Sequence, residues 1–163
     1  MNKYFITLIF IILVTISGCG TKEIELERER SSGLPIASNQ ETEFTKQELM
    51  KLEEVLLEIG DAPKEIISVH PISIKKVNNG LQVTALLQNG FSESIQNLSG
   101  NVKLLVAGEI VSSKDFSLKK EEFGVLESGQ SKPWNFLFPE VQLGDKADIS
   151  DFSLAVGFSY DIQ

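Results

Sequence analysis

The sequence predicts a mainly β protein, an immunoglobulin-like antiparallel β-sandwich preceded by one amphipathic helix. From residue 66 onward, apolar side chains recur at every second position, as they do in strands that bury one face. Turn-forming residues interrupt these runs about every ten residues, which is typical of a sandwich of roughly six or seven short strands. Ahead of the strands, one segment has the apolar spacing of a helix.

Residues 1–18 have the three-part organisation of a signal peptide. Lys3 supplies the basic start, and residues 4–16 form an uncharged, mostly apolar run. At about 1.5 Å per residue this run is about 20 Å long as a helix, well short of the ~30 Å of a hydrocarbon core. We therefore expect a cleaved signal peptide and not a transmembrane helix.

The end of this run has a distinctive order of residues. Ile16, Ser17 and Gly18 precede Cys19, the only cysteine of the chain. An aliphatic residue, two small residues and a cysteine resemble the lipobox of bacterial lipoproteins. The resemblance implies cleavage between Gly18 and Cys19, and attachment of a diacylglycerol with palmitate-type chains to the Cys19 thiol. Two acyl chains are enough for stable anchoring in a membrane. A secreted protein with an incidental cysteine is the alternative.

Lipidation and charge together exclude several functions. With Cys19 acylated, no thiol remains for a disulfide or a nucleophile. The whole chain has a net charge of −8, and cleavage would remove Lys3 and no acid, which leaves −9. So acidic a surface argues against nucleic acid and anionic lipid head groups as partners.

Two segments connect the anchor to the sandwich. Residues 19–44 contain the lipid anchor site and a polar, charged stretch that predicts a flexible tether. Residues 45–60 predict an amphipathic helix, in which Thr45 and Glu48 match a capping box and Gly60 ends the helix. Its apolar face comprises Leu49, Leu52, Val55, Leu56 and Ile59. We expect this face to pack on its own domain, and a partner-binding helix is the alternative.

Residues 66–163 form the predicted sandwich. Asn78-Asn79-Gly80 separates two alternating runs and predicts a hairpin with a type I′ turn, which needs positive φ at both central residues. A second Asn-Gly pair, Asn89-Gly90, ends the second strand, where the backbone demand of a turn explains both residues. Residues 119–126 and 142–149 break the alternation and predict loops with helical turns. The later strands alternate at Val102, Leu104 and Val106, at Trp134, Phe136 and Phe138, and at Phe152, Leu154, Val156 and Phe158.

Several runs occur together in the order of a known module. They are GLQVTA at 80–85, QNG at 88–90, KDFSL at 114–118, FGVL at 123–126 and SGQSKPWNFLFP at 128–139. The most specific residues are Pro133, Trp134, Phe136 and Phe138, with Asn89 and Gly90. From about residue 67 to residue 158 the chain resembles the SLAP domain, a module of Gram-positive surface proteins linked with S-layer assembly and accessory Sec export.

The resemblance implies a surface or export role and supplies no catalytic residue. Gln88 and Lys132 stand where the family usually has arginine. These differences remove a bidentate donor from any partner contact made there.

Residues that could support catalysis or bind a metal are few. His70 is the only histidine and precedes Pro71, so we expect a partly exposed strand-edge residue. Asp145, Asp148 and Asp151 recur every third position, which does not match the alternate ligands of a calcium loop, and we expect turn acids. The sequence therefore predicts no enzyme, no metal site and no cofactor.

The leading hypothesis is a non-catalytic lipoprotein on the outer face of the cytoplasmic membrane of a Gram-positive bacterium. Its sandwich would bind a cell-surface or export protein through a face or an edge strand. The alternative is a lipoprotein that binds an envelope polymer or carbohydrate, for which an exposed Trp134 would be the best anchor. Three aromatic residues on one strand face favour a core position for Trp134. An enzyme would need an acidic pair in a cleft, which the sequence does not reveal.

Overall fold

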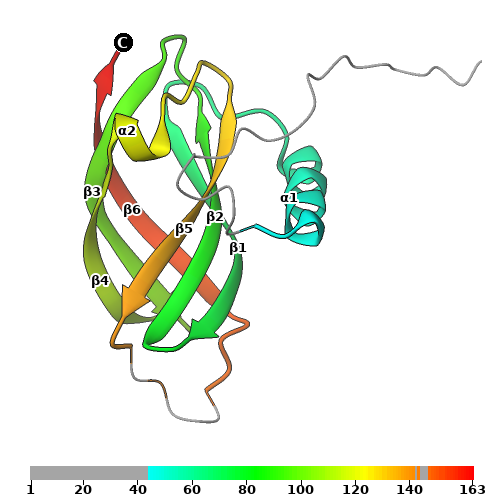
Figure 1. Ribbon diagram of the computed structural model, residues 1–163, viewed down its shortest axis with the longest axis vertical. Helices are drawn as coiled ribbons and strands as arrows, with labels where there is room; N and C mark the ends of the chain where they lie inside the picture. The colour runs from blue at the N-terminus through cyan, green and yellow to red at the C-terminus, as the bar shows by residue number, and fades with distance from the viewer. Residues whose placement is uncertain (1–43, 142, 144–146) are drawn as a thin grey trace, which may run out of the picture. The chain divides into compact units, whose positions relative to one another are not determined.

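The computed structural model describes residues 44–141, 143 and 147–163 (Figure 1). The elements in chain order are α1 (Lys46–Ile59), β1 (Ile67–Val77), β2 (Gly80–Asn89), β3 (Ile95–Val106), β4 (Glu109–Leu118), α2 (Lys120–Phe123), β5 (Ser131–Pro139) and β6 (Phe152–Ile162). The predicted signal peptide, lipobox and tether lie outside the described residues, apart from residue 44. Within the described ranges, no helix is both long and apolar enough to cross a membrane.

The six strands of the described chain form two antiparallel sheets of three strands each. The first sheet has the order β1-β2-β5 and the second the order β4-β3-β6. In immunoglobulin nomenclature these orders correspond to strands A-B-E and C′-C-F. The predicted mainly β sandwich with one preceding helix is therefore confirmed.

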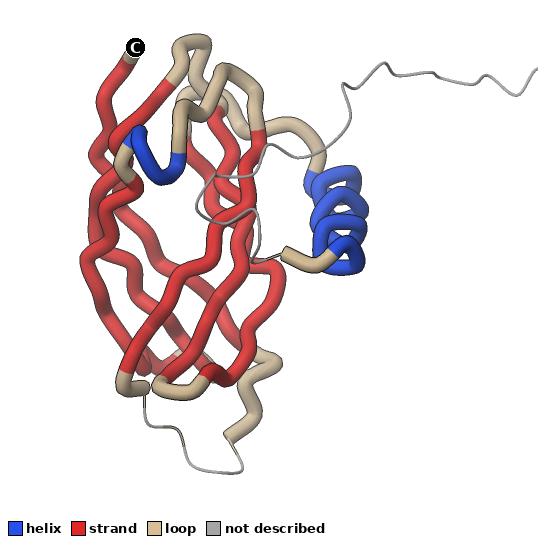
Figure 2. The backbone as a smooth tube through the Cα atoms, viewed as in Figure 1, coloured by secondary structure: helices blue, strands red, loops and turns tan. Residues whose placement is uncertain are grey.

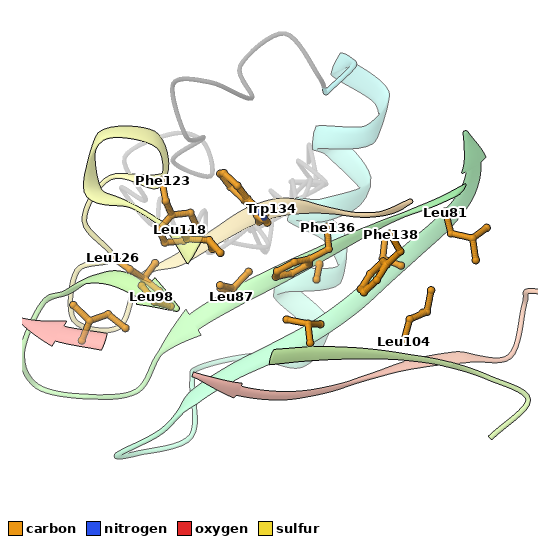
Figure 3. Close-up of a cluster of buried hydrophobic side chains, with 14 residues drawn as sticks. Leu81, Leu87, Leu98, Leu104, Leu118, Phe123, Leu126, Trp134, Phe136 and Phe138 are labelled. Atoms are coloured by element: carbon orange, nitrogen blue, oxygen red, sulfur yellow. The ribbon is translucent and has the colours of Figure 1, made fainter. Parts of the chain in front are cut away.

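The core lies between the two sheets (Figure 3). Strands β2, β3 and β5 supply most of the core residues, and the inward residues of these strands alternate as the sequence predicts. Phe116 of β4 packs edge-on against Phe136 and Phe138, with ring centroids 5.0 and 5.4 Å apart. The buried apolar residues of the core are Leu81, Val83, Ala85, Leu87, Ile95, Leu98, Val102, Leu104, Leu118, Phe123, Leu126, Trp134, Phe136 and Phe138.

Helix α1 packs on the outer face of the first sheet, beside the strands (Figure 2). Thr45 caps it, because its side chain accepts from the Glu48 N–H while Glu48 accepts from the Thr45 N–H. Leu52 is buried against Phe44 and against Leu86, whose side chain lies on the face of β2 opposite the core. The expectation that the helix packs on its own domain is thus confirmed, and it explains why β2 is buried on both faces.

The β1–β2 hairpin is present, but its predicted turn type is wrong. Val77 pairs with Gly80, and neither Asn78 nor Asn79 between them has a positive φ. Instead, Gly80 has a φ of 151°, and a Cβ there would lie 2.0 Å from the Phe138 carbonyl oxygen. Glycine at position 80 therefore permits the close approach of β5, and the Asn-Gly pair does not form the two central residues of the turn.

A type I′ geometry occurs instead between β3 and β4. Val106 pairs with Glu109, and the two central residues, Ala107 and Gly108, have φ of 50° and 79°. The predicted helical turn within residues 119–126 is present as α2. Of the other predicted loop, 142–149, residues 142 and 144–146 lie outside the described residues.

Candidate functional site

Asn89 is a structural residue, fully buried at the end of β2. Its side-chain amide donates to the carbonyls of Glu93 (2.8 Å) and Leu126 (3.0 Å), and its side-chain oxygen accepts from the Phe91 N–H (2.9 Å). These bonds satisfy three buried or part-buried backbone groups from two separate segments. Asn89 therefore ties the β2–β3 loop to the segment before β5 and presents nothing to a ligand.

Gly90 is required for a different reason than a turn. Its φ is not in the left-handed region, but a Cβ there would lie 1.7 Å from the Pro63 carbonyl oxygen. Its N–H donates to Ile66 O, and its carbonyl accepts from the Glu65 N–H, each at 2.9 Å. The expected backbone demand of a turn is thus replaced by close contact with the segment that leads into β1.

The side chains of Gln88 and Lys132 both point inward. Gln88 is 1% exposed and donates to Gly60 O at the end of α1 (3.0 Å) and to Ser131 Oγ (3.1 Å). Lys132 is 6% exposed and donates to the carbonyls of Phe123 (2.9 Å) and Val125 (3.0 Å). Burial lowers the pKa of Lys132, and the nearby Glu127 partly opposes this. Both side chains therefore make contacts within the domain.

The aromatic motif also belongs to the core. Trp134 is 7% exposed and packs edge-on against Phe123, with ring centroids 5.5 Å apart, as Figure 3 shows. Phe136 and Phe138 are fully buried, and the backbone of Pro133 lies in β5 opposite Leu86. The expected core position of Trp134 is confirmed. A carbohydrate-binding role loses the residue that would have been its best anchor.

The remaining candidates do not gather into a site. His70 is half-buried on β1, an edge strand, and its Nε2 lies 3.1 Å from Ser68 Oγ. Asp148 accepts from the Ser150 N–H (2.9 Å), and the side-chain and backbone bonds of Ser150 lower its pKa, as in a turn. Asp145 lies outside the described residues. Among those that are described, no group of three His, Cys, Asp or Glu side chains could hold a metal.

The structure brings together a set of side chains that sequence reasoning did not. An open cleft of about 380 Å³ lies where the edge strands β1 and β6 meet across the sandwich. Strand β6 contributes Leu154, Val156, Phe158 and Tyr160. The facing wall consists of Glu65, Ile66, Ile67, Val69 and Phe91. We call this the β1–β6 cleft.

Two edge strands, β1 and β6, flank the cleft. Along β6 every inward side chain from Phe152 to Tyr160 is only partly buried, whereas Val102 and Leu104 on the central strand β3 are fully buried. Ile66, at the rim, is 48% exposed.

At the opposite seam, side chains of β4 contact β5. Phe116 covers Phe136 and Phe138 there, and Lys114 reaches across to donate to the Leu137 carbonyl at 3.2 Å. The Lys114 ammonium also lies 5.0 Å from the Phe116 ring centroid. Side chains of β4 therefore bridge this seam, whereas the cleft lies along the β1–β6 side.

The cleft carries negative charge. Glu65 is its one charged lining residue, Asp151 immediately precedes β6, and the Asp161 carboxylate accepts from Asn97 of β3. Strand β6 contains no lysine or arginine, and Lys64, next to Glu65 in sequence, does not line the cleft. One feature of the sequence indicates this surface, namely the alternation of β6 without a basic residue. The order of the strands, which brings β1 and β6 together, could not be predicted from the sequence.

The fold is a small immunoglobulin-like β-sandwich with one helix packed on its first sheet. The chain belongs to the SLAP domain family, whose model matches residues 34–158. The match begins ahead of α1, in agreement with the packing of that helix on the first sheet. Neither the comparison with curated proteins nor the comparison with solved structures returned a match.

Proposed function

We propose that the protein is a membrane-anchored lipoprotein whose non-catalytic SLAP domain binds another protein in cell-surface assembly or export. The observation that carries the binding role is the β1–β6 cleft, which lies between two edge strands and is lined mostly by apolar residues. Membership of the SLAP family supports a module associated with the S-layer or the accessory Sec system. The inward orientation of the motif residues favours a scaffold role for them and leaves the cleft as the binding surface.

The anchor rests on the order Ile16, Ser17, Gly18, Cys19. Cleavage before Cys19 and diacylglycerol on its thiol would hold the domain on the outer face of the cytoplasmic membrane of a Gram-positive bacterium. The polar residues 20–44 would act as the tether, with a root-mean-square span of about 25–30 Å if flexible. A net charge of −8 supports a domain that stays off the anionic membrane surface.

Acyl labelling and crosslinking on intact cells test this function. A clickable palmitate analogue is expected to label the wild-type chain and Ser17→Ala, which keeps a small residue before the cleavage point, but not Cys19→Ala. Crosslinking is expected to recover a protein partner from wild type and Ser17→Ala, and much less from Cys19→Ala. Equal labelling of Cys19→Ala contradicts the anchor. Recovery of glycan without protein contradicts the proposed partner class.

A further inference from the structure

We propose that β6 accepts an extended segment of a partner protein as a fourth strand of the β4-β3-β6 sheet. This segment has apolar side chains at alternate positions, which enter the β1–β6 cleft, and lysine or arginine at its ends. The inference rests on the proposed binding function and specifies its site and the chemistry of the partner.

The first support is the unpaired edge of β6. The strand pairs with β3 from Val106↔Phe152 to Ile95↔Ile162, and no strand of the described chain pairs with its other edge. In a complete immunoglobulin sandwich, strand G pairs with strand F, the equivalent of β6. An edge strand of eleven residues with free backbone N–H and C=O groups is a template for another strand.

The side chains on this edge do nothing to repel a new strand. Edge strands are commonly protected by lysine, proline or an inward-pointing charge. The outward side chains from Ser153 to Ser159 are instead small, namely Ser153, Ala155, Gly157 and Ser159, and Asp161 beyond them accepts from Asn97 Nδ2 of β3. The inward ones are apolar from Phe152 to Tyr160 and are only partly buried. An added strand with alternating apolar residues would complete their burial.

The charges select the occupant. Glu65 lies in the cleft wall and Asp151 immediately precedes β6, and the residues that line the cleft include no basic group. A segment with basic ends complements these two carboxylates. A second copy of the chain would instead bring two more aspartates to the same edge and no lysine or arginine from its own β6. The partner is therefore a basic segment of a different protein.

Hydrogen exchange of the full chain, purified in detergent, with a synthetic probe tests strand addition. The probe is a peptide of alternating valine and threonine with lysines at both ends, and its control has glutamates in place of the lysines. The lysine peptide is expected to slow exchange of amides in β6 and to leave β4, the outer strand of the same sheet, unchanged. The glutamate peptide is expected to bind at least about tenfold more weakly, because it repels the acidic rim.

Two variants on the same strand separate the cleft from general charge effects. Val156→Lys places an ammonium in the cleft, and we expect it to weaken binding of the lysine peptide about tenfold or more. Ala155→Lys adds the same charge on the exposed outer face. In this variant, the protection of β6 by the lysine peptide is expected to stay within about twofold of that in the wild type. Circular dichroism and thermal unfolding check that both variants fold.

Every outcome of this experiment decides the inference. Protection of β6 that the lysine peptide produces and Val156→Lys abolishes supports it. Protection that appears without peptide and rises with protein concentration identifies a second copy as the occupant and overturns it. Absence of β6 protection at the solubility limit of the peptide, or equal binding of both peptides, also overturns it. Because the probe is supplied in solution, failure here combined with a protein partner in the cell crosslinking would reject strand addition but leave the proposed function intact.

Discussion

The Lys132 ammonium lies over the ring of Phe123, 5.0 Å from its centroid, and donates to the Phe123 carbonyl at 2.9 Å. A second bond to the Val125 carbonyl, at 3.0 Å, lets one side chain of β5 hold both ends of the turn that follows α2. Gly124 makes room for it, since a Cβ there would lie 3.1 Å from Nζ. The contacts bring the β4–β5 connection against Trp134, which packs on the same Phe123 ring.

We predict that Lys132→Met lowers the free energy of unfolding by about 2–3 kcal/mol, because two carbonyls lose a charged donor in a buried place. The matched control is Lys114→Met on β4. Lys114 also donates to a carbonyl and lies over a phenylalanine ring, but it is less buried and makes one such bond. Urea unfolding of both variants measures the difference. An equal loss in the two would mean that the buried bonds of Lys132 add nothing.

The same lysine predicts a pH dependence of stability. Burial lowers the pKa of Lys132 in the folded protein below its ordinary value of 10.5. Between the lowered pKa and 10.5, the unfolded chain therefore holds the proton more firmly than the folded chain. Stability is expected to rise as the pH increases through this interval. In urea unfolding from about pH 8 to about pH 11, the free energy of unfolding of the wild type should rise with pH relative to that of Lys132→Met. An unchanged profile in the variant would assign the slope to other groups.

The strands and the helix could be predicted from the sequence because they depend on local periodicity. The alternation at Trp134, Phe136 and Phe138 correctly indicated a core strand, and the capping box of Thr45 and Glu48 correctly indicated where α1 begins. Each signal lies within a few residues of the structure that it predicts.

The cleft and the roles of single motif residues could not be predicted in this way. The β1–β6 cleft depends on which strands lie at the sheet edges, and Ile67 and Phe158 come together only through that order. Lys132 and Gln88 satisfy backbone groups outside their own strands, so the alternation of those strands does not reveal their inward orientation. The turn at Asn78-Asn79 was mispredicted because the approach of β5 to Gly80, a tertiary contact, determines the need for glycine.

Gly90 provides a third prediction. Gly90→Ala is expected to destabilise the fold by about 2–3 kcal/mol or more, because its Cβ would overlap the Pro63 carbonyl and force the segment before β1 away from β2. Gly157→Ala is the control, since a Cβ there meets no atom within 4 Å and φ is not in the left-handed region. Thermal unfolding compares the two variants. A similar midpoint for both would contradict the close approach at Gly90.

The last prediction concerns Glu65, which lines the β1–β6 cleft with a φ of 61°. A side chain in this left-handed conformation costs about 1–2 kcal/mol, and glycine avoids that cost while losing more freedom on folding. Glu65→Gly is therefore expected to raise the free energy of unfolding by up to about 1 kcal/mol. Glu140→Gly is the matched control, because Glu140 has a φ of 59° and does not line the cleft.

The two glutamate variants should differ in binding. Both are expected to gain stability in urea unfolding, but only Glu65→Gly removes a carboxylate from the cleft wall and should weaken binding of the lysine-ended peptide. Glu65→Gln keeps the length of the side chain and removes its charge. It should weaken binding of the lysine-ended peptide to a similar extent, without the gain in stability. If Glu65→Gly and Glu140→Gly bound the peptide equally well, the carboxylate of Glu65 would have no part in selecting a basic segment.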